Sequence, residues 1–171
     1  MKKVLSALAL ALLAAPMAQA HATLDVKEIA LNSWQRVAVR VPHGCDGEPT
    51  LRVRVAIPEG VVGVKPMPKP GWTLTTVKGP ITPYQSHGQT ITEGVKEIIW
   101  EGELSDEHYD EFVFQARFTD ALPEGMLPIP VVQECATGFQ RWIEVPAEGQ
   151  DPHSLAFPAP QVKIVPAVHQ H

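Results

Sequence analysis

The sequence lacks the motifs that mark several common enzyme classes. It has no His-Glu-x-x-His, no Gly-x-Ser-x-Gly, no phosphate-binding glycine loop and no Cys-x-x-Cys. The usual signatures of zinc peptidases, serine hydrolases, nucleotide-binding proteins and dithiol oxidoreductases are therefore missing. We accordingly expect a protein that is not an enzyme.

Basic residues are also scarce. The 171 residues include 14 Lys and Arg against 19 Asp and Glu. Without Lys2 and Lys3, which lie in the predicted leader described next, 12 basic residues remain, and the net charge is about −7 with histidine neutral. No basic run occurs, so we expect neither a nucleic-acid partner nor attraction to an anionic membrane surface.

The first 20 residues have the pattern of a cleaved secretory signal. Lys2 and Lys3 provide the positive start, residues 4–15 are almost all Ala, Leu and Val, and Ala18-Gln19-Ala20 forms a small-x-small cleavage site. The apolar run is too short for a transmembrane helix. We expect a periplasmic protein that has no stable membrane insertion after cleavage and begins at His21.

A histidine at the first position of a mature chain is a chelator. Its α-amine has an unperturbed pKa of roughly 7.7 to 8.0, which makes it far easier to deprotonate than a lysine. The amine nitrogen and the imidazole Nδ1 of His21 can close one ring on a single ion, and two nitrogen donors in a tetragonal site favour Cu(II). Copper is the cofactor that this end of the chain predicts.

Only two cysteines are present, Cys45 and Cys135. Export would carry both to an oxidising compartment, where a disulfide is the favoured interpretation. The alternative is a metal site built from the His43-Gly44-Cys45 turn and Cys135, which would need both thiols reduced.

Short stretches of alternating apolar and polar residues, separated by Pro and Gly, predict strands throughout residues 21–160. We expect an all-β, immunoglobulin-like β-sandwich of about seven to nine strands. The 17 prolines disfavour long helices. Residues 58–72 predict an extended Pro-rich surface loop, and the chain after Pro146 predicts an irregular strap, with residues 161–171 as a C-terminal tail.

Three carboxylates are candidates for completing a site at His21: Glu28, Glu111 and Glu144. Trp142 and Glu144 are two residues apart on a predicted strand, which would place an indole and a carboxylate on one face. The alternative is a tryptophan in the core beside an edge charge. His169 and His171 are possible accessory metal ligands at the end of the chain.

Several unusual stretches resemble the YcnI-like domain family of exported bacterial proteins. They are HATL at 21–24, RVPHGCDG at 40–47, VKPMPKPGW at 64–72, EGVKEIIWEG at 93–102, HYDEFVF at 108–114, PVVQEC at 130–135 and RWIEVPAEG at 141–149. The resemblance implies a β-sandwich that handles copper and holds Cu(II) by a single-histidine brace. It assigns the brace to His21, the nearby tryptophan to Trp142 and the acidic ligand to one of the three glutamates, and with them a disulfide between Cys45 and Cys135.

The expected function is therefore copper trafficking, as a periplasmic metallochaperone or scavenger. Its partners would be the copper ion and another periplasmic copper chaperone or a copper-transport membrane protein. Two alternatives stay open at this point. One is a copper-dependent oxidative enzyme, and the other is an adhesion or assembly module without metal that uses the Pro-rich loop 58–72 as its contact surface.

Overall fold

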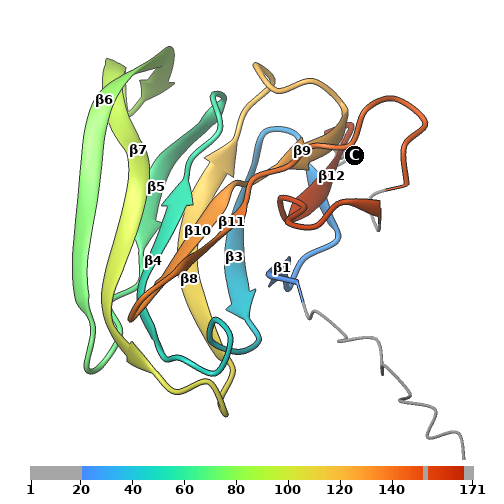
Figure 1. Ribbon diagram of the computed structural model, residues 1–171. Helices are drawn as coiled ribbons and strands as arrows, with labels where there is room; N and C mark the ends of the chain where they lie inside the picture. The colour runs from blue at the N-terminus through green and yellow to red at the C-terminus, as the bar shows by residue number, and fades with distance from the viewer. Residues whose placement is uncertain (1–20, 152–153, 168–171) are drawn as a thin grey trace, which may run out of the picture.

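A computed structural model describes residues 21–151 and 154–167, and this part of the chain forms twelve β-strands and no α-helix (Figure 1). The predicted signal peptide, His169 and His171 lie outside the described residues. In the part of the chain that is described, no helix is long and apolar enough to cross a membrane.

Two main sheets and a small third sheet make up the fold. The four-stranded sheet has the order β1-β3-β8-β5, the five-stranded sheet β11-β10-β4-β7-β6, and the small sheet β2-β12-β9. The pairing is antiparallel except between β2 and β12. The strands are β1 (Thr23–Leu24), β2 (Glu28–Ala30), β3 (Ser33–Val41), β4 (Thr50–Ala56), β5 (Val61–Pro66), β6 (Thr73–Ser86), β7 (Gln89–Leu104), β8 (Asp110–Phe118), β9 (Gly125–Pro128), β10 (Val131–Cys135), β11 (Phe139–Trp142) and β12 (Gln161–Val165).

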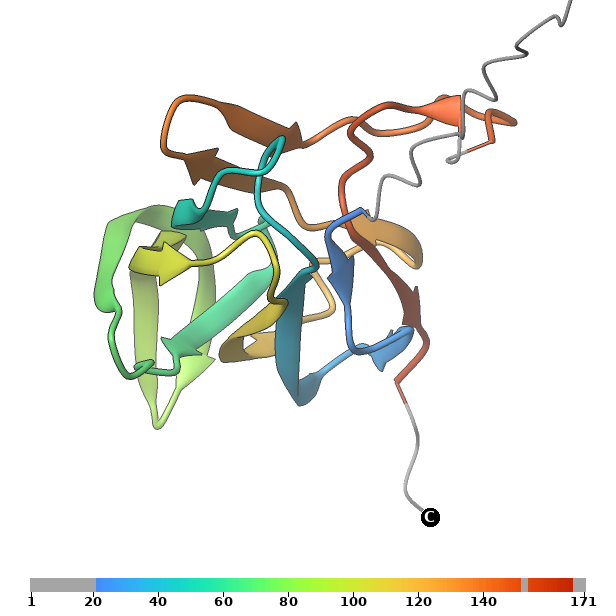
Figure 2. The ribbon, with the colours of Figure 1, turned by 60° about the horizontal axis from the view of Figure 1, so that its bottom comes forward.

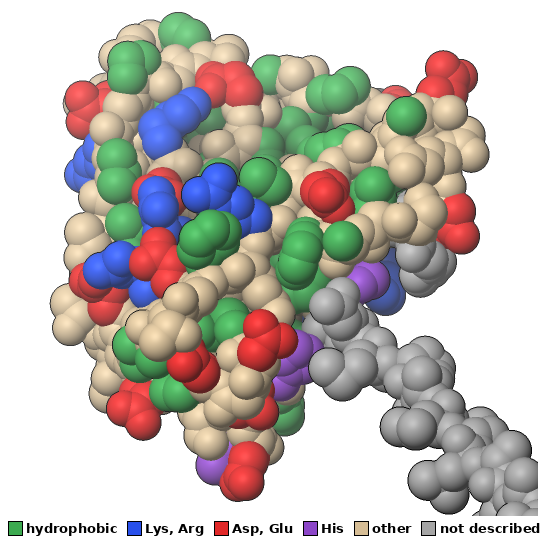
Figure 3. All heavy atoms as spheres, viewed as in Figure 1, with side chains coloured by type: hydrophobic (Ala, Val, Ile, Leu, Met, Phe, Trp, Pro, Cys, Tyr) green, Lys and Arg blue, Asp and Glu red, His purple; other side chains and the backbone are tan. Residues whose placement is uncertain are grey.

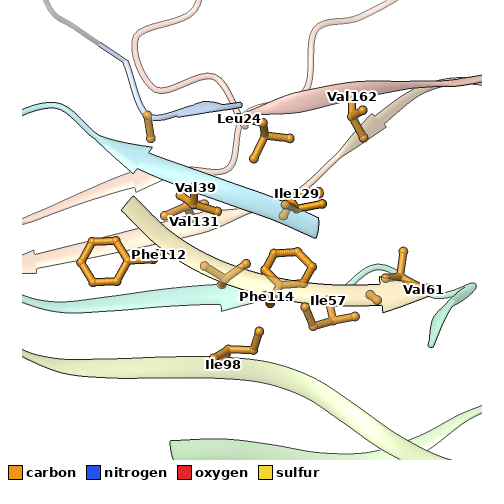
Figure 4. Close-up of a cluster of buried hydrophobic side chains, with 14 of the residues drawn as sticks. Leu24, Val39, Ile57, Val61, Ile98, Phe112, Phe114, Ile129, Val131 and Val162 are labelled. Carbon is orange, nitrogen blue, oxygen red and sulfur yellow. The ribbon is translucent and has the colours of Figure 1, made fainter. Parts of the chain in front are cut away.

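The alternation along the strands sorts side chains between core and solvent, as the sequence pattern predicts. On β4, Val53 and Val55 are fully buried while Arg52 and Arg54 face outward. Figure 4 shows Phe112 and Phe114 of β8 packed among aliphatic side chains from both sheets. This interleaved core confirms the β-sandwich.

The outer face of the five-stranded sheet carries a network of ion pairs. Arg52 pairs with Glu101 and Glu134, and Arg54 pairs with Glu97 at 2.8 Å. Figure 3 shows acidic and basic side chains intermingled on this side of the molecule. Such exposed pairs contribute little each to stability.

Two segments differ from the expectation. Part of the predicted Pro-rich loop is strand β5, in which Val61 and Val62 are buried; β5 lies at a sheet edge, where a proline such as Pro66 is tolerated. The tail predicted from residue 161 begins instead with β12, because Val162 and Ile164 complete the core. With the short strands β1, β2 and β9, they raise the number to twelve, above the expected seven to nine.

The predicted disulfide is present. Cys45 and Cys135 are bonded, with their Cα atoms 6.0 Å apart. The bond ties the connection between β3 and β4 to the end of β10. The alternative metal site on reduced cysteines is therefore not the arrangement in this structure.

Candidate functional site

His21 lies against Trp142. The centroids of the imidazole and indole rings are 5.6 Å apart, and the ring planes are tilted by 53°. His21 is partly buried, whereas Trp142 is fully buried. The first described residues and the strap before β12 lie side by side at this place (Figures 1 and 2). The fold thus brings together the two residues on which the sequence interpretation chiefly rested.

Trp142 reaches the core because β11 pairs with β10, with Trp142 opposite Val131. Its indole packs against the Phe157 ring at 5.3 Å between centroids. Its Nε1 donates a hydrogen bond of 3.2 Å to Oε1 of Gln133. The tryptophan is therefore a core residue, as the alternative interpretation had it, and it also contacts His21.

A shallow hollow of about 220 Å³ opens beside His21. It is lined by His21, Ala22, Thr23, Met126, Pro158, Ala159 and Gln161. The imidazole therefore borders a space open to solvent on one side and the buried indole on the other.

Glu144 pairs with a chain segment that lines this hollow. Its main chain forms a bridge with Pro158, and its carbonyl accepts a 2.8 Å hydrogen bond from the Ala159 nitrogen. Its carboxylate Oε2 accepts a 2.7 Å hydrogen bond from the Phe157 nitrogen. Pro158 and Ala159 also line the hollow, so Glu144 is close in the fold to the residues around His21.

The other two candidate carboxylates are engaged by cations. Glu28 pairs with Lys163 at 3.0 Å between β2 and β12. Glu111 accepts a 2.8 Å hydrogen bond from Arg40, which raises the pKa of that guanidinium above its usual value. Arg36 lies 3.7 Å from the same carboxylate. Both glutamates thus have partners on the strands next to their own.

Within residues 21–151 and 154–167, no three His, Cys, Asp or Glu side chains gather closely enough to hold a metal ion. The ring Nδ1 of His43 lies 2.6 Å from the carbonyl oxygen of Gly44, which is a local main-chain contact.

Sequence reasoning missed Gln133. This residue is fully buried and forms hydrogen bonds with Trp142, Thr50 and the main chain of His43. The only signal in the sequence is a polar residue that shares one face of its strand with the apolar Val131 and Cys135.

Residues 21–164 match the family described as Domain of unknown function (DUF1775). The chain belongs to this family. It is the YcnI-like family that the sequence motifs indicated. The matched region begins at His21 and extends through most of β12, so the whole sandwich is the family domain.

A solved structure from Nocardia farcinica is similar in fold. It is described as an uncharacterized protein whose crystal structure reveals an immunoglobulin-like fold, with 21% sequence identity and a TM-score of 0.61. The likeness covers 86% of this chain and 99% of that one. It confirms the immunoglobulin-like fold of the DUF1775 domain. No curated protein matches the chain significantly.

Proposed function

We propose that this DUF1775 protein is exported to the periplasm and binds Cu(II) there, as a copper metallochaperone or scavenger. Cleavage after Ala20 would leave His21 as the first residue. Its α-amine and its imidazole Nδ1 would then hold one ion together. The observation that carries the proposal is the packing of His21 on the buried indole of Trp142, beside an open hollow.

The donor chemistry fits Cu(II). The proposed site counts the main-chain amine as one donor and the imidazole as a second, so it needs only one carboxylate from the rest of the chain. Among the three candidates, Glu144 is the strongest, because its main chain pairs with Pro158 and Ala159, which line the hollow. Glu28 and Glu111 are engaged by Lys163 and Arg40. The buried indole of Trp142 would shield one side of the ion and stiffen its surroundings.

The setting of His21 suits exchange of the ion. A partly buried imidazole at the rim of a hollow leaves one side of the site open to an approaching ligand. A copper chaperone in the same compartment or a copper-transport membrane protein would be the exchange partner. His169 and His171 would add accessory ligands.

The decisive experiment compares two forms of the protein. One begins at His21, and the other keeps one extra residue before it, so that the α-amine becomes an amide. We expect the first to bind one Cu(II) tightly, with nitrogen hyperfine structure in electron paramagnetic resonance, and the second to lose this site. Equal binding by both forms would refute the brace.

The carboxylate is tested in the processed protein. We expect Glu144→Gln to weaken Cu(II) binding roughly 10-fold or more, as removal of a metal-site contact commonly does. Glu28→Gln is the matched control, because it removes an equivalent charge at a carboxylate paired with Lys163. Equal affinities of the two variants would remove Glu144 from the site.

A further inference from the structure

A chain of buried polar groups lies beneath the proposed site. Trp142 Nε1 donates to Oε1 of Gln133 at 3.2 Å. The side-chain nitrogen of Gln133 donates in turn to Oγ1 of Thr50 and to the carbonyl oxygen of His43, each at 2.7 Å. Gln133 and Thr50 are both fully buried. Every hydrogen-bonding group at the end of the Gln133 side chain is thus in use.

Such an amide restricts the indole that it binds. A buried N–H without an acceptor is costly, so the Trp142 ring is held in the orientation that points Nε1 at Gln133. This orientation also determines which part of the ring meets His21, 5.6 Å away between centroids. A purely apolar residue at position 133 would leave the core packed but would not select this orientation.

The Gln133 amide donates a hydrogen bond to a turn that the disulfide fixes in place. One of its acceptors is the carbonyl of His43, in the turn that contains Cys45. This turn is closed by a pair of main-chain hydrogen bonds between Cys45 and Glu48, 3.1 and 2.9 Å long. Cys45 is bonded to Cys135, which lies two residues beyond Gln133 on β10. The disulfide therefore keeps the His43 carbonyl next to the strand that carries Gln133.

We infer that Gln133 is a positioning residue of the metal site, which fixes Trp142 against His21 and is itself held by the disulfide-bonded turn. This inference rests on the proposed function for its effect on copper. Its structural part, the placement of Trp142 against His21, is measurable in protein without metal.

The test uses protein that begins at His21 and two matched variants. Gln133→Met removes the amide but keeps an unbranched side chain of similar length. Gln140→Met is the control, because Gln140 is also buried, lies directly opposite Gln133 in the sheet, and makes no hydrogen bond to Trp142. Nuclear Overhauser contacts between the His21 and Trp142 rings are measured without metal, and Cu(II) affinity and paramagnetic resonance spectra with it.

We expect Gln133→Met to lose the ring contact, to weaken Cu(II) binding roughly 10-fold and to change the resonance spectrum, while Gln140→Met matches the parent protein. If Gln133→Met keeps both the contact and the affinity, the inference is overturned. Should Gln133→Met not fold, Thr50→Val removes one of the two acceptors of Gln133 and must weaken the ring contact; an unchanged contact overturns the inference equally.

The two proposals fail separately. If the protein beginning at His21 binds Cu(II) no better than the extended form, the proposed function is wrong. Loss of the ring contact in metal-free Gln133→Met would still support the positioning of Trp142 by Gln133.

Discussion

The Cys45–Cys135 bond should be a principal source of stability in this sandwich. It joins positions 90 residues apart, with Cα atoms 6.0 Å from each other. In the chain-entropy treatment, closing a loop of this length lowers the entropy of the unfolded chain enough to stabilise the fold by about 4–5 kcal/mol. Replacing both cysteines by alanine should therefore lower Tm by about 10–15 °C for a domain of this size.

Thermal unfolding followed by circular dichroism measures the shift in Tm, and urea unfolding followed by tryptophan fluorescence measures the loss in free energy of unfolding. Alanine is preferred to serine because both cysteines are buried, and a hydroxyl there would add a desolvation cost. Two controls with a thiol reductant separate the effect of losing the disulfide from the effect of changing the side chains. The reductant should lower the urea midpoint of the parent protein to that of the double variant, and it should leave the midpoint of the double variant unchanged. A loss below about 1 kcal/mol would refute the reasoning.

Two further predictions concern single residues. A Cβ at Gly44 would lie 1.8 Å from the Glu48 carbonyl oxygen, so Gly44→Ala should lower the free energy of unfolding by about 1–3 kcal/mol. Gly138→Ala is the control, because no atom lies within 4 Å of the added Cβ, and it should change this free energy by less than about 0.5 kcal/mol. Urea titrations measure both changes. A hydrogen bond from Lys96 is the main cause that lowers the pKa of Glu59 to about 2, from its usual 4.5. Because the folded-state pKa is depressed, this stabilisation is present above pH 4.5 and is lost as the pH falls toward 2. Glu59→Gln should flatten the pH dependence of stability in that window, only slightly because Glu59 is half exposed, and an NMR titration giving an ordinary Glu59 pKa would contradict this prediction.

The sequence predicted most of the long strands because their alternation is local. Val53 and Val55 are buried between outward arginines, as the period of two requires. The same rule failed for β5, since the prolines around it predict a loop and only its edge position makes a strand possible. It also failed for β12, whose burial depends on β2 and β9 as neighbours.

The candidate site was predictable only in part. The spacing of Trp142 and Glu144 indicated that the two residues belong together, and the structure places Glu144 beside the strap that borders the hollow. The sequence pattern left Glu28 and Glu111 as candidates beside Glu144. Their ion pairs with Lys163 and Arg40 form between strands that are far apart along the chain, so the sequence does not reveal them. The role of Gln133 was not predictable from the sequence, because its hydrogen-bond partners come from three different segments.

By itself, the sequence determined the β-rich character and the pair of cysteines that forms the disulfide, and it predicts His21 as the residue that leader cleavage would expose. These properties depend on the local order of side chains or on there being only one possible pair. Only the tertiary structure decided that the Trp142 indole lies against His21 and that Gln133 holds it there. Those contacts join residues distant in the sequence, and they exist because the two sheets pack face to face and bring β11, β10 and the start of the chain to one place.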